Sequence, residues 1–165
     1  MSKYLIIDTR EKPKAITKIV AQFDAAGIKY EKSKLLFGDY MDYNRPGIVI
    51  DRKQNIAELA KNVTGPKEER DRFRAELERA KAAGAHLVIL VEQNRYKDPD
   101  RGEWRQVHKI SDLMLWSNPH TSIRGERVFR ALTGLIYKYD ISIIFCDKRV
   151  TGRKIIEVIY GQQQQ

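Results

Sequence analysis

Residues 87–91 read Leu-Val-Ile-Leu-Val and are the strongest signal for a buried strand in this chain. A strand with one face in water alternates apolar and polar side chains, whereas an unbroken apolar run is typical of a strand covered on both faces. Segments with apolar residues at helical spacing, around 16–23, 66–83 and 128–139, are available to cover it. The run therefore predicts an α/β domain in which helices pack on both faces of a central sheet.

The other segments fit the same arrangement. Residues 4–7 predict a first buried strand, and 28–53 predict a meander of short strands broken by turn residues at 38–39 and 44–47. The further expected elements are a short helix at 54–63, a long loop over 93–122 with a short helix near 111–115, a strand at 141–145 and a helix at 152–160. With 165 residues, we expect a single domain over 1–161 and a disordered tail at 162–165.

A formal charge of +9 favours an anionic partner, and nucleic acid is the commonest one. A candidate DNA-binding patch flanks Gly152 at the start of the last expected helix, where backbone N–H groups can hold phosphate. Its members are Lys148, Arg149, Arg153 and Lys154. The alternative interpretation is a solvated charged face without a ligand.

No apolar run approaches the roughly 20 residues of a membrane helix, and the first residues lead into a strand without a signal-peptide core. We therefore expect no membrane partner and an intracellular protein, cytoplasmic if it is bacterial, archaeal or phage-encoded. Trp104 and Trp116 could stack on bases, but interior packing is the favoured interpretation for both.

A candidate active site combines Asp39, Asp51 and Lys53. Asp39 follows Gly38 in a strand region, and Asp51 ends the next apolar strand. Because strand side chains alternate, Asp51 and Lys53 point to one face and Arg52 to the other. Carboxylate oxygens suit Mg²⁺, for which Mn²⁺ is expected to substitute, and an ammonium can orient water or offset the charge that develops on a phosphate. This is the metal-nuclease pattern PD-(D/E)xK, and it predicts hydrolysis of phosphodiester bonds.

Three neighbouring motifs make the pattern more specific. They are Ile-Asp-Thr-Arg-Glu at 7–11, Leu-Phe-Gly-Asp-Tyr at 36–40 and Ile-Asp-Arg-Lys at 50–53. In this order they resemble the nuclease domain of the XPF-type (xeroderma pigmentosum group F) structure-specific endonucleases. The likeness continues with Arg72 near the start of the long helix and with an apolar strand that ends in Glu92.

The resemblance implies a restriction-endonuclease-like fold, a central mixed sheet flanked by helices, that uses a divalent metal to incise duplex DNA beside a branch, flap or fork. Asp39 and Asp51 would be the metal ligands, with Asp8 close to the metal, and Lys53 would be the catalytic lysine. Arg10, Glu11, Arg52 and Arg72 would support the site or hold phosphate. The resemblance also implies a homodimer formed through the C-terminal helices and the last strand.

Two departures from the family pattern bear on these roles. The family's glutamate at the second acidic position is Asp51 here, one methylene shorter. The family's acidic residue four positions after the lysine is Ala57, with Glu58 one position later. We also expect the family's helix-hairpin-helix DNA-binding domain to be absent.

Other interpretations remain open. Singly, Asp39 could be a turn residue, Asp51 to Lys53 a polar strand end and 8–11 a capped helix start. One alternative function is a non-catalytic DNA-binding or scaffolding module that needs a partner subunit. Another is a restriction-type nuclease that cuts intact duplex at a sequence.

Overall fold

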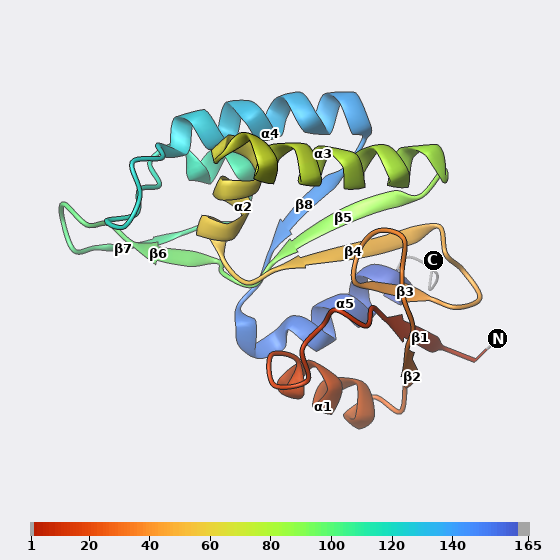
Figure 1. Ribbon diagram of the computed structural model, residues 1–165. Helices are drawn as coiled ribbons and strands as arrows, with labels where there is room; N and C mark the ends of the chain where they lie inside the picture. Colours follow the sequence, from red (N-terminus) through yellow and green to blue (C-terminus); the bar gives the residue numbers. More distant parts are fainter. Residues whose placement is uncertain (1, 162–165) are drawn as a thin grey trace.

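A mixed sheet forms the centre of the computed structural model, which describes residues 2–161 (Figure 1). The sheet has six strands in the order β2-β1-β3-β4-β5-β8. Their bounds are Lys29–Lys32 for β2, Tyr4–Ile7 for β1, Tyr40–Asp42 for β3, Ile48–Lys53 for β4, His86–Val91 for β5 and Ser142–Phe145 for β8. β3 runs antiparallel to both β1 and β4, whereas β2 with β1, β4 with β5, and β5 with β8 are parallel pairs. The predicted α/β fold is confirmed.

Five helices cover the two faces of the sheet, as expected for strands that are buried on both sides (Figure 1). The layer formed by α3 and α4 lies above the sheet in the figure, and α1 and α5 lie below it. Their bounds are Thr17–Ala25 for α1, Ile56–Thr64 for α2, Lys67–Ala82 for α3, Gly125–Tyr139 for α4 and Thr151–Tyr160 for α5. Each layer packs on its own hydrophobic cluster, so the sheet separates two cores.

The alternation of side chains along β4 decides which layer each of its residues meets. Val49 belongs to the cluster beneath α2, α3 and α4, and Ile50 to the cluster of α1 and α5. Asp51 and Lys53 continue the first face and Arg52 the second. The last residues of β4 therefore direct Asp51 and Lys53 toward the layer of α2, α3 and α4, and Arg52 toward the layer of α1 and α5.

Residues 28–53 differ in part from the predicted meander. β3 and β4 are antiparallel neighbours, as a meander requires. β2, however, pairs in parallel with β1, with Tyr4 opposite Lys29. This pairing follows from α1, which carries the chain back to the starting edge of the sheet so that β2 lies alongside β1 in the same direction.

The predicted long loop over 93–122 is wrong where it missed two strands, whereas the short helix predicted near 111–115 is present at 110–113. The segment contains an antiparallel hairpin of β6 (Arg95–Lys97) and β7 (Trp104–Gln106), followed by the short 3₁₀ helix η1 (Ile110–Leu113). Of the three residues of β6, only Tyr96 is buried, so the strand lacks the apolar pattern that would have revealed it. Trp116 is buried as predicted, but Trp104 is 59% exposed, and its predicted interior packing is wrong.

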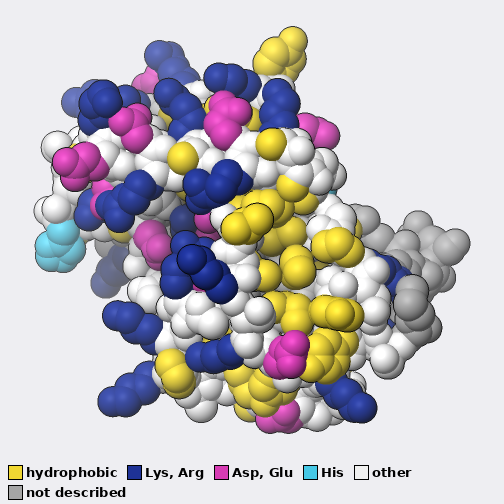
Figure 2. All heavy atoms as spheres, turned by 45° about the vertical axis from the view of Figure 1, so that its right-hand side comes forward, with side chains coloured by type: hydrophobic (Ala, Val, Ile, Leu, Met, Phe, Trp, Pro, Cys, Tyr) yellow, Lys and Arg dark blue, Asp and Glu magenta, His cyan; other side chains and the backbone are white. Residues whose placement is uncertain are grey.

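The surface carries basic side chains on several elements. Figure 2 shows Lys and Arg spread over the upper helical layer and along one side, with Asp and Glu between them, next to a band of hydrophobic side chains. Among the described residues, no helix is both long and apolar enough to cross a membrane. The tail at 162–165, predicted to be disordered, lies outside the described residues.

Candidate active site

Backbone hydrogen bonds hold Asp39 between two strands, immediately before β3. Its N–H donates to the carbonyl of Ile50 at 2.7 Å, and its own carbonyl accepts from the N–H of Asp8 at 2.8 Å. Its side chain is fixed as well, because Asp39 Oδ2 accepts from the backbone N–H of Arg52 at 2.8 Å. The pairing of β3 with β4 thus places the Asp39 carboxylate beside the end of β4.

Gly38 allows the backbone before Asp39 to lie close to β4. It has a φ of +73°, and a Cβ at this position would lie 2.3 Å from Val49 Cγ1. Both the left-handed backbone and the close contact require glycine. We expect Gly38→Ala to lower the free energy of unfolding by about 1–3 kcal/mol and to reduce any activity that depends on Asp39.

Urea denaturation of Gly38→Ala measures this loss. The matched control is Gly134→Ala in α4, where nothing lies within 4 Å of the added Cβ. Alanine in a helix interior is favoured over glycine by roughly 0.5–1 kcal/mol, so the control should be slightly stabilised. Equal stability of Gly38→Ala and the native protein would contradict the role given to Gly38.

Asp51 and Lys53 converge with Asp39 on one polar cavity of about 300 Å³. Lys53 Nζ lies 3.1 Å from Asp51 Oδ2 and 5.0 Å from the centroid of the Phe73 ring. Among the described residues Asp51 Oδ2 is buried without a hydrogen-bond partner, and the Lys53 ammonium is its ion-pair partner. A buried carboxylate oxygen without such a partner is costly unless it meets a cation.

Glu76 also lines this cavity, and the sequence analysis missed it. It comes from α3, whose buried stripe is Phe73, Leu77 and Ala80. Glu76 lies within that stripe by spacing, and its Oε2 lies 3.4 Å from the backbone N–H of Gly38. An acidic residue in the apolar stripe of an amphipathic helix was the signal that could have identified it.

Crowding of acidic groups changes the ionisation of the cavity. Burial raises the pKa of Asp39 to about 9, and the negative charges of Asp51 and Glu11 add to the effect. Burial and the charge of Asp51 raise the pKa of Glu76 to about 8. For Lys53, burial lowers the pKa, but the carboxylates of Asp51 and Glu76 outweigh it, so the net shift is upward. The cavity therefore attracts cations and holds Lys53 as ammonium.

Arg52 organises the opposite face of the sheet. Its Nε donates to Glu11 Oε2 at 2.7 Å, and its Nη1 donates to Glu92. Tyr40 Oη donates to Glu11 Oε2 at 2.8 Å, and Thr151 Oγ1 donates to Glu92 Oε2 at 2.7 Å. This buried network joins β3, β4 and α5 to the segments that follow β1 and β5, and two of its members, Glu11 and Arg52, also line the cavity, as predicted for residues that support the site.

A comparison with models of protein families shows which family the chain belongs to. The family model described as the ERCC4 domain matches residues 7–157. This chain belongs to the ERCC4 domain family. The ERCC4 domain assignment confirms the XPF-type nuclease domain that the motifs at 7–11, 36–40 and 50–53 predicted. The protein is thus a domain of the nuclease type.

Solved structures show the same fold as this ERCC4 domain. XPF from Aeropyrum pernix aligns with a TM-score of 0.65 at 15% identity, and XPF from Aeropyrum pernix in complex with DNA aligns with a TM-score of 0.66 at 17% identity. Each alignment covers 98% of this chain and 66% of the other, so the ERCC4 domain here spans only 66% of the length of those chains. No curated protein matches the chain.

The cavity of this ERCC4 domain fits a hydrated divalent cation. Within residues 2–161, no three His, Cys, Asp or Glu side chains lie close enough together to hold an ion on their own. Asp39 and Asp51 offer carboxylate oxygens, including the buried Asp51 Oδ2, which pairs with the Lys53 ammonium but accepts no hydrogen bond among the described residues. Mg²⁺ usually keeps several waters and is bound through one or two carboxylates, so this donor set suits it.

The acidic groups also predict how stability of the metal-free ERCC4 domain depends on pH. The raised pKa values of Asp39 and Glu76 mean that the folded state binds more protons than the unfolded state above about pH 4. Stability should therefore fall as pH rises from about 5 to about 8. A cation that binds the ionised carboxylates should reduce this fall.

Urea denaturation in EDTA at several pH values tests this expectation, and Glu76→Gln removes one of the titrating groups. That variant should show a shallower decline than the native chain. Stability that is constant or increases over the same range would contradict the assigned burial and crowding of these carboxylates.

The structure places the other expected site residues differently. Arg10 lines the cavity with an exposed guanidinium. The Asp8 carboxylate does not line it, because its oxygens accept from the Leu35 N–H at 2.8 Å and from Arg10 Nε at 2.5 Å. Arg72 is 72% exposed, pairs with Glu69 on the surface of α3 and is not brought to the cavity.

The basic residues near the C-terminus do not line this cavity. Lys148 and Arg149, in the short 3₁₀ helix η2 (Lys148–Val150), line a second hollow that shares Gln54 with it. Lys154 pairs with Glu157 at 3.2 Å on α5. Their predicted contact with DNA stays a prediction.

The departure at positions 57 and 58 has a structural explanation. Glu58 lines the cavity, but its Oε2 accepts from the N–H of Gln54 at 2.7 Å. Asn55 in turn caps α2 by accepting from the N–H of Glu58 at 2.8 Å. Glu58 therefore takes part in the hydrogen bonds that fix the start of α2.

Proposed function

We propose that this ERCC4 domain is a divalent-metal-dependent DNA endonuclease that hydrolyses phosphodiester bonds beside branches, flaps or forks. The observation that carries the proposal is the convergence of Asp39, Asp51 and Lys53 on one polar cavity. Two carboxylates from paired strands and a buried ammonium are the groups that phosphodiester hydrolysis needs. The preference for junctions is supported by the likeness to XPF-type nucleases.

Mg²⁺, or Mn²⁺ in its place, would be held by Asp39 and Asp51. When bound, the ion would supply Lewis-acid stabilisation of phosphate oxygens and a more acidic water. Asp39 is pre-positioned for this role, since the Arg52 N–H and the two flanking strands fix it before any ligand arrives. The cost of bringing the carboxylates together is therefore met by folding.

Lys53 orients the attacking water or offsets negative charge on the phosphate. Its Nζ is buried against the Phe73 ring, which leaves the ammonium few directions in which to donate other than toward Asp51 and the cavity. Arg10 and Lys12 lie at the rim of the same cavity. They are placed to hold flanking phosphates of a DNA backbone.

The test is a cleavage panel with labelled flap, fork, blunt duplex and single-stranded DNA. We expect cleavage of the flap and fork in Mg²⁺ or Mn²⁺ and none in EDTA. Absence of cleavage of every substrate in either metal would contradict the proposal. A junction that is bound but never cut would favour a non-catalytic scaffolding module, and a discrete fragment ladder from intact plasmid would favour a restriction-type nuclease. Homodimerisation through α4, β8 and α5 stays a prediction.

A further inference from the structure

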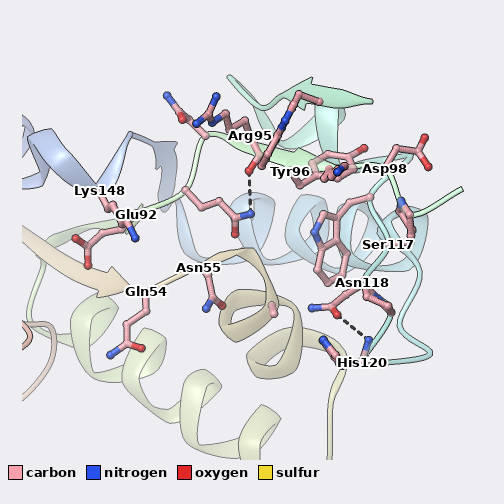
Figure 3. A pocket seen from close by; sticks show the side chains of 18 of the residues that line it. Gln54, Asn55, Glu92, Arg95, Tyr96, Asp98, Ser117, Asn118, His120 and Lys148 are labelled. Atoms are coloured by element: carbon pink, nitrogen blue, oxygen red, sulfur yellow. Dashed lines mark hydrogen bonds between the residues drawn. The ribbon is translucent and has the colours of Figure 1, made fainter. Parts of the chain in front are cut away.

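A second hollow, of about 1170 Å³, lies next to the cavity. Figure 3 shows side chains from separate elements around it: Arg95 and Tyr96 from the β6–β7 hairpin, Asn118 and His120 from the segment before α4, and Lys148. Pockets for small molecules measure about 300–1,000 Å³, so this hollow has room for part of a polymer.

The hollow adjoins the candidate active site at one residue. Gln54, the residue after Lys53, lines both. Asn55, the cap of α2, follows it in the wall of the larger hollow. A chain lying in the larger hollow can therefore extend past Gln54 to the carboxylates of Asp39 and Asp51.

Trp104 gives this hollow an exposed aromatic surface. Its side chain is 59% exposed, and the Arg95 guanidinium lies 4.7 Å from the centroid of its ring system. Trp104 also lines a third hollow, formed with residues of β7 and η1, so its indole borders two open spaces. An indole backed by a guanidinium is a platform on which a base can stack.

The carboxylates that line the hollow are already neutralised within the protein. Arg52 holds Glu92 from behind the sheet. Arg149 pairs with Asp147 at 2.7 Å. Asp98 accepts from backbone N–H groups of its own turn and from a guanidinium of β7 at 3.1 Å. These acids therefore oppose an anionic ligand only weakly.

Three cations in the lining lack such partners. Arg95, Lys97 and Lys148 are exposed, and within residues 2–161 none of them forms an ion pair with a carboxylate. Free cations around an aromatic platform are the features of sites that bind single-stranded nucleic acid. In a duplex the base faces are covered by their neighbours, so only an unpaired strand can use the exposed face of Trp104.

We propose that this hollow binds single-stranded DNA, with one base stacked on Trp104 and the backbone held by Arg95, Lys97 and Lys148. The inference rests on the proposed function, for which it supplies a contact with the unpaired arm of a flap or fork. The path past Gln54 then places the junction between paired and unpaired DNA at the candidate active site.

The experiment measures binding without cleavage. Fluorescence anisotropy in EDTA compares a labelled oligothymidine of about 10 nucleotides, within the usual site size, with a blunt duplex. We expect Trp104→Ala to raise the Kd for the single strand about 5- to 100-fold and to leave duplex binding unchanged. Trp104→Phe keeps an aromatic face and should restore most of the affinity.

The matched control is Tyr137→Ala, which removes a 92% exposed aromatic side chain from α4, outside the hollow, and should change neither Kd.

A second readout uses the intrinsic fluorescence of the native chain, whose only tryptophans are Trp104 and Trp116. Trp116 also lines the hollow but is only 4% exposed, so quenching by oligothymidine should come mainly from Trp104 and should fall sharply in Trp104→Phe. Native-level single-strand binding by Trp104→Ala, or an equal loss of duplex binding, would overturn the inference.

The two proposals can fail separately. Flap cleavage by a protein that does not bind oligothymidine would overturn the single-strand site and leave the nuclease intact. Trp104-dependent binding without cleavage in any metal would support the site and contradict the nuclease.

Discussion

An Asp51→Asn variant is expected to lose DNA cleavage by about 100- to 1,000-fold or more while remaining folded. Asparagine preserves the shape of the side chain but removes the charge and the buried Oδ2 that has no hydrogen-bond partner. Lys53 keeps a neighbouring carboxylate in Glu76, so the buried ammonium is not left without a counter-charge. The loss of activity should therefore reflect cation binding rather than unfolding.

Thermal denaturation with and without Mg²⁺ separates these causes. A bound ion raises the unfolding temperature of the native chain by mass action, and Asp51→Asn should lose most of that increase. The matched control, Asp71→Asn, removes an exposed carboxylate that pairs with Lys67 on α3 and should cut DNA normally. Cleavage by Asp51→Asn at the native rate would show that a contaminant or another site is responsible.

An Arg52→Leu variant is expected to lose about 3–5 kcal/mol of unfolding free energy, the largest stability effect that we predict. The side chains of Arg52, Glu11 and Glu92 are 6%, 9% and 10% exposed. Leucine leaves two carboxylates in the interior without the guanidinium that neutralises them. Arg52→Lys should recover only part of the loss, because one ammonium cannot reproduce the fork that spans both acids.

Urea denaturation of Arg52→Leu measures the loss, and adding Glu11→Gln should recover some stability by removing one of the stranded charges. The control is Arg130→Leu, which breaks a surface pair with Glu126 in which the arginine is 76% exposed. Such exposed pairs contribute little, so the control should be close to the native protein. If the two leucine variants unfold at the same denaturant concentration, the network does not stabilise the fold as described.

Two features that are local in sequence carried most of what could be predicted. The unbroken apolar run at 87–91 marked β5, the central parallel strand, and its need for cover on both faces. The alternation along 49–53 placed Asp51 and Lys53 on the face opposite Arg52. Both follow from the geometry of a single strand, so they can be read without knowing its neighbours.

Polar segments were harder to predict, because their structure depends on contacts with other segments and leaves no apolar pattern in the sequence. The β6–β7 hairpin buries only one residue of β6, and pairing between its strands, rather than an apolar pattern, holds it together. The exposure of Trp104 depends on that hairpin standing away from the cores. The neighbouring residues were a signal that could have been used, because Trp104 lies between Glu103 and Arg105, whereas the buried Trp116 follows Met114 and Leu115.

The sequence by itself determined an α/β nuclease-type domain, the order of its helices and of the strands of its main sheet, and the set of Asp39, Asp51 and Lys53. Only the tertiary structure decided that Glu76 reaches the same cavity, that the Asp8 carboxylate turns to Leu35 and Arg10, and that Arg72 remains on the surface. The physical reason is the range of the contacts. Alternation and helical spacing act over a few residues, whereas these placements depend on how α3 packs on the sheet and how the strands before Asp39 are paired.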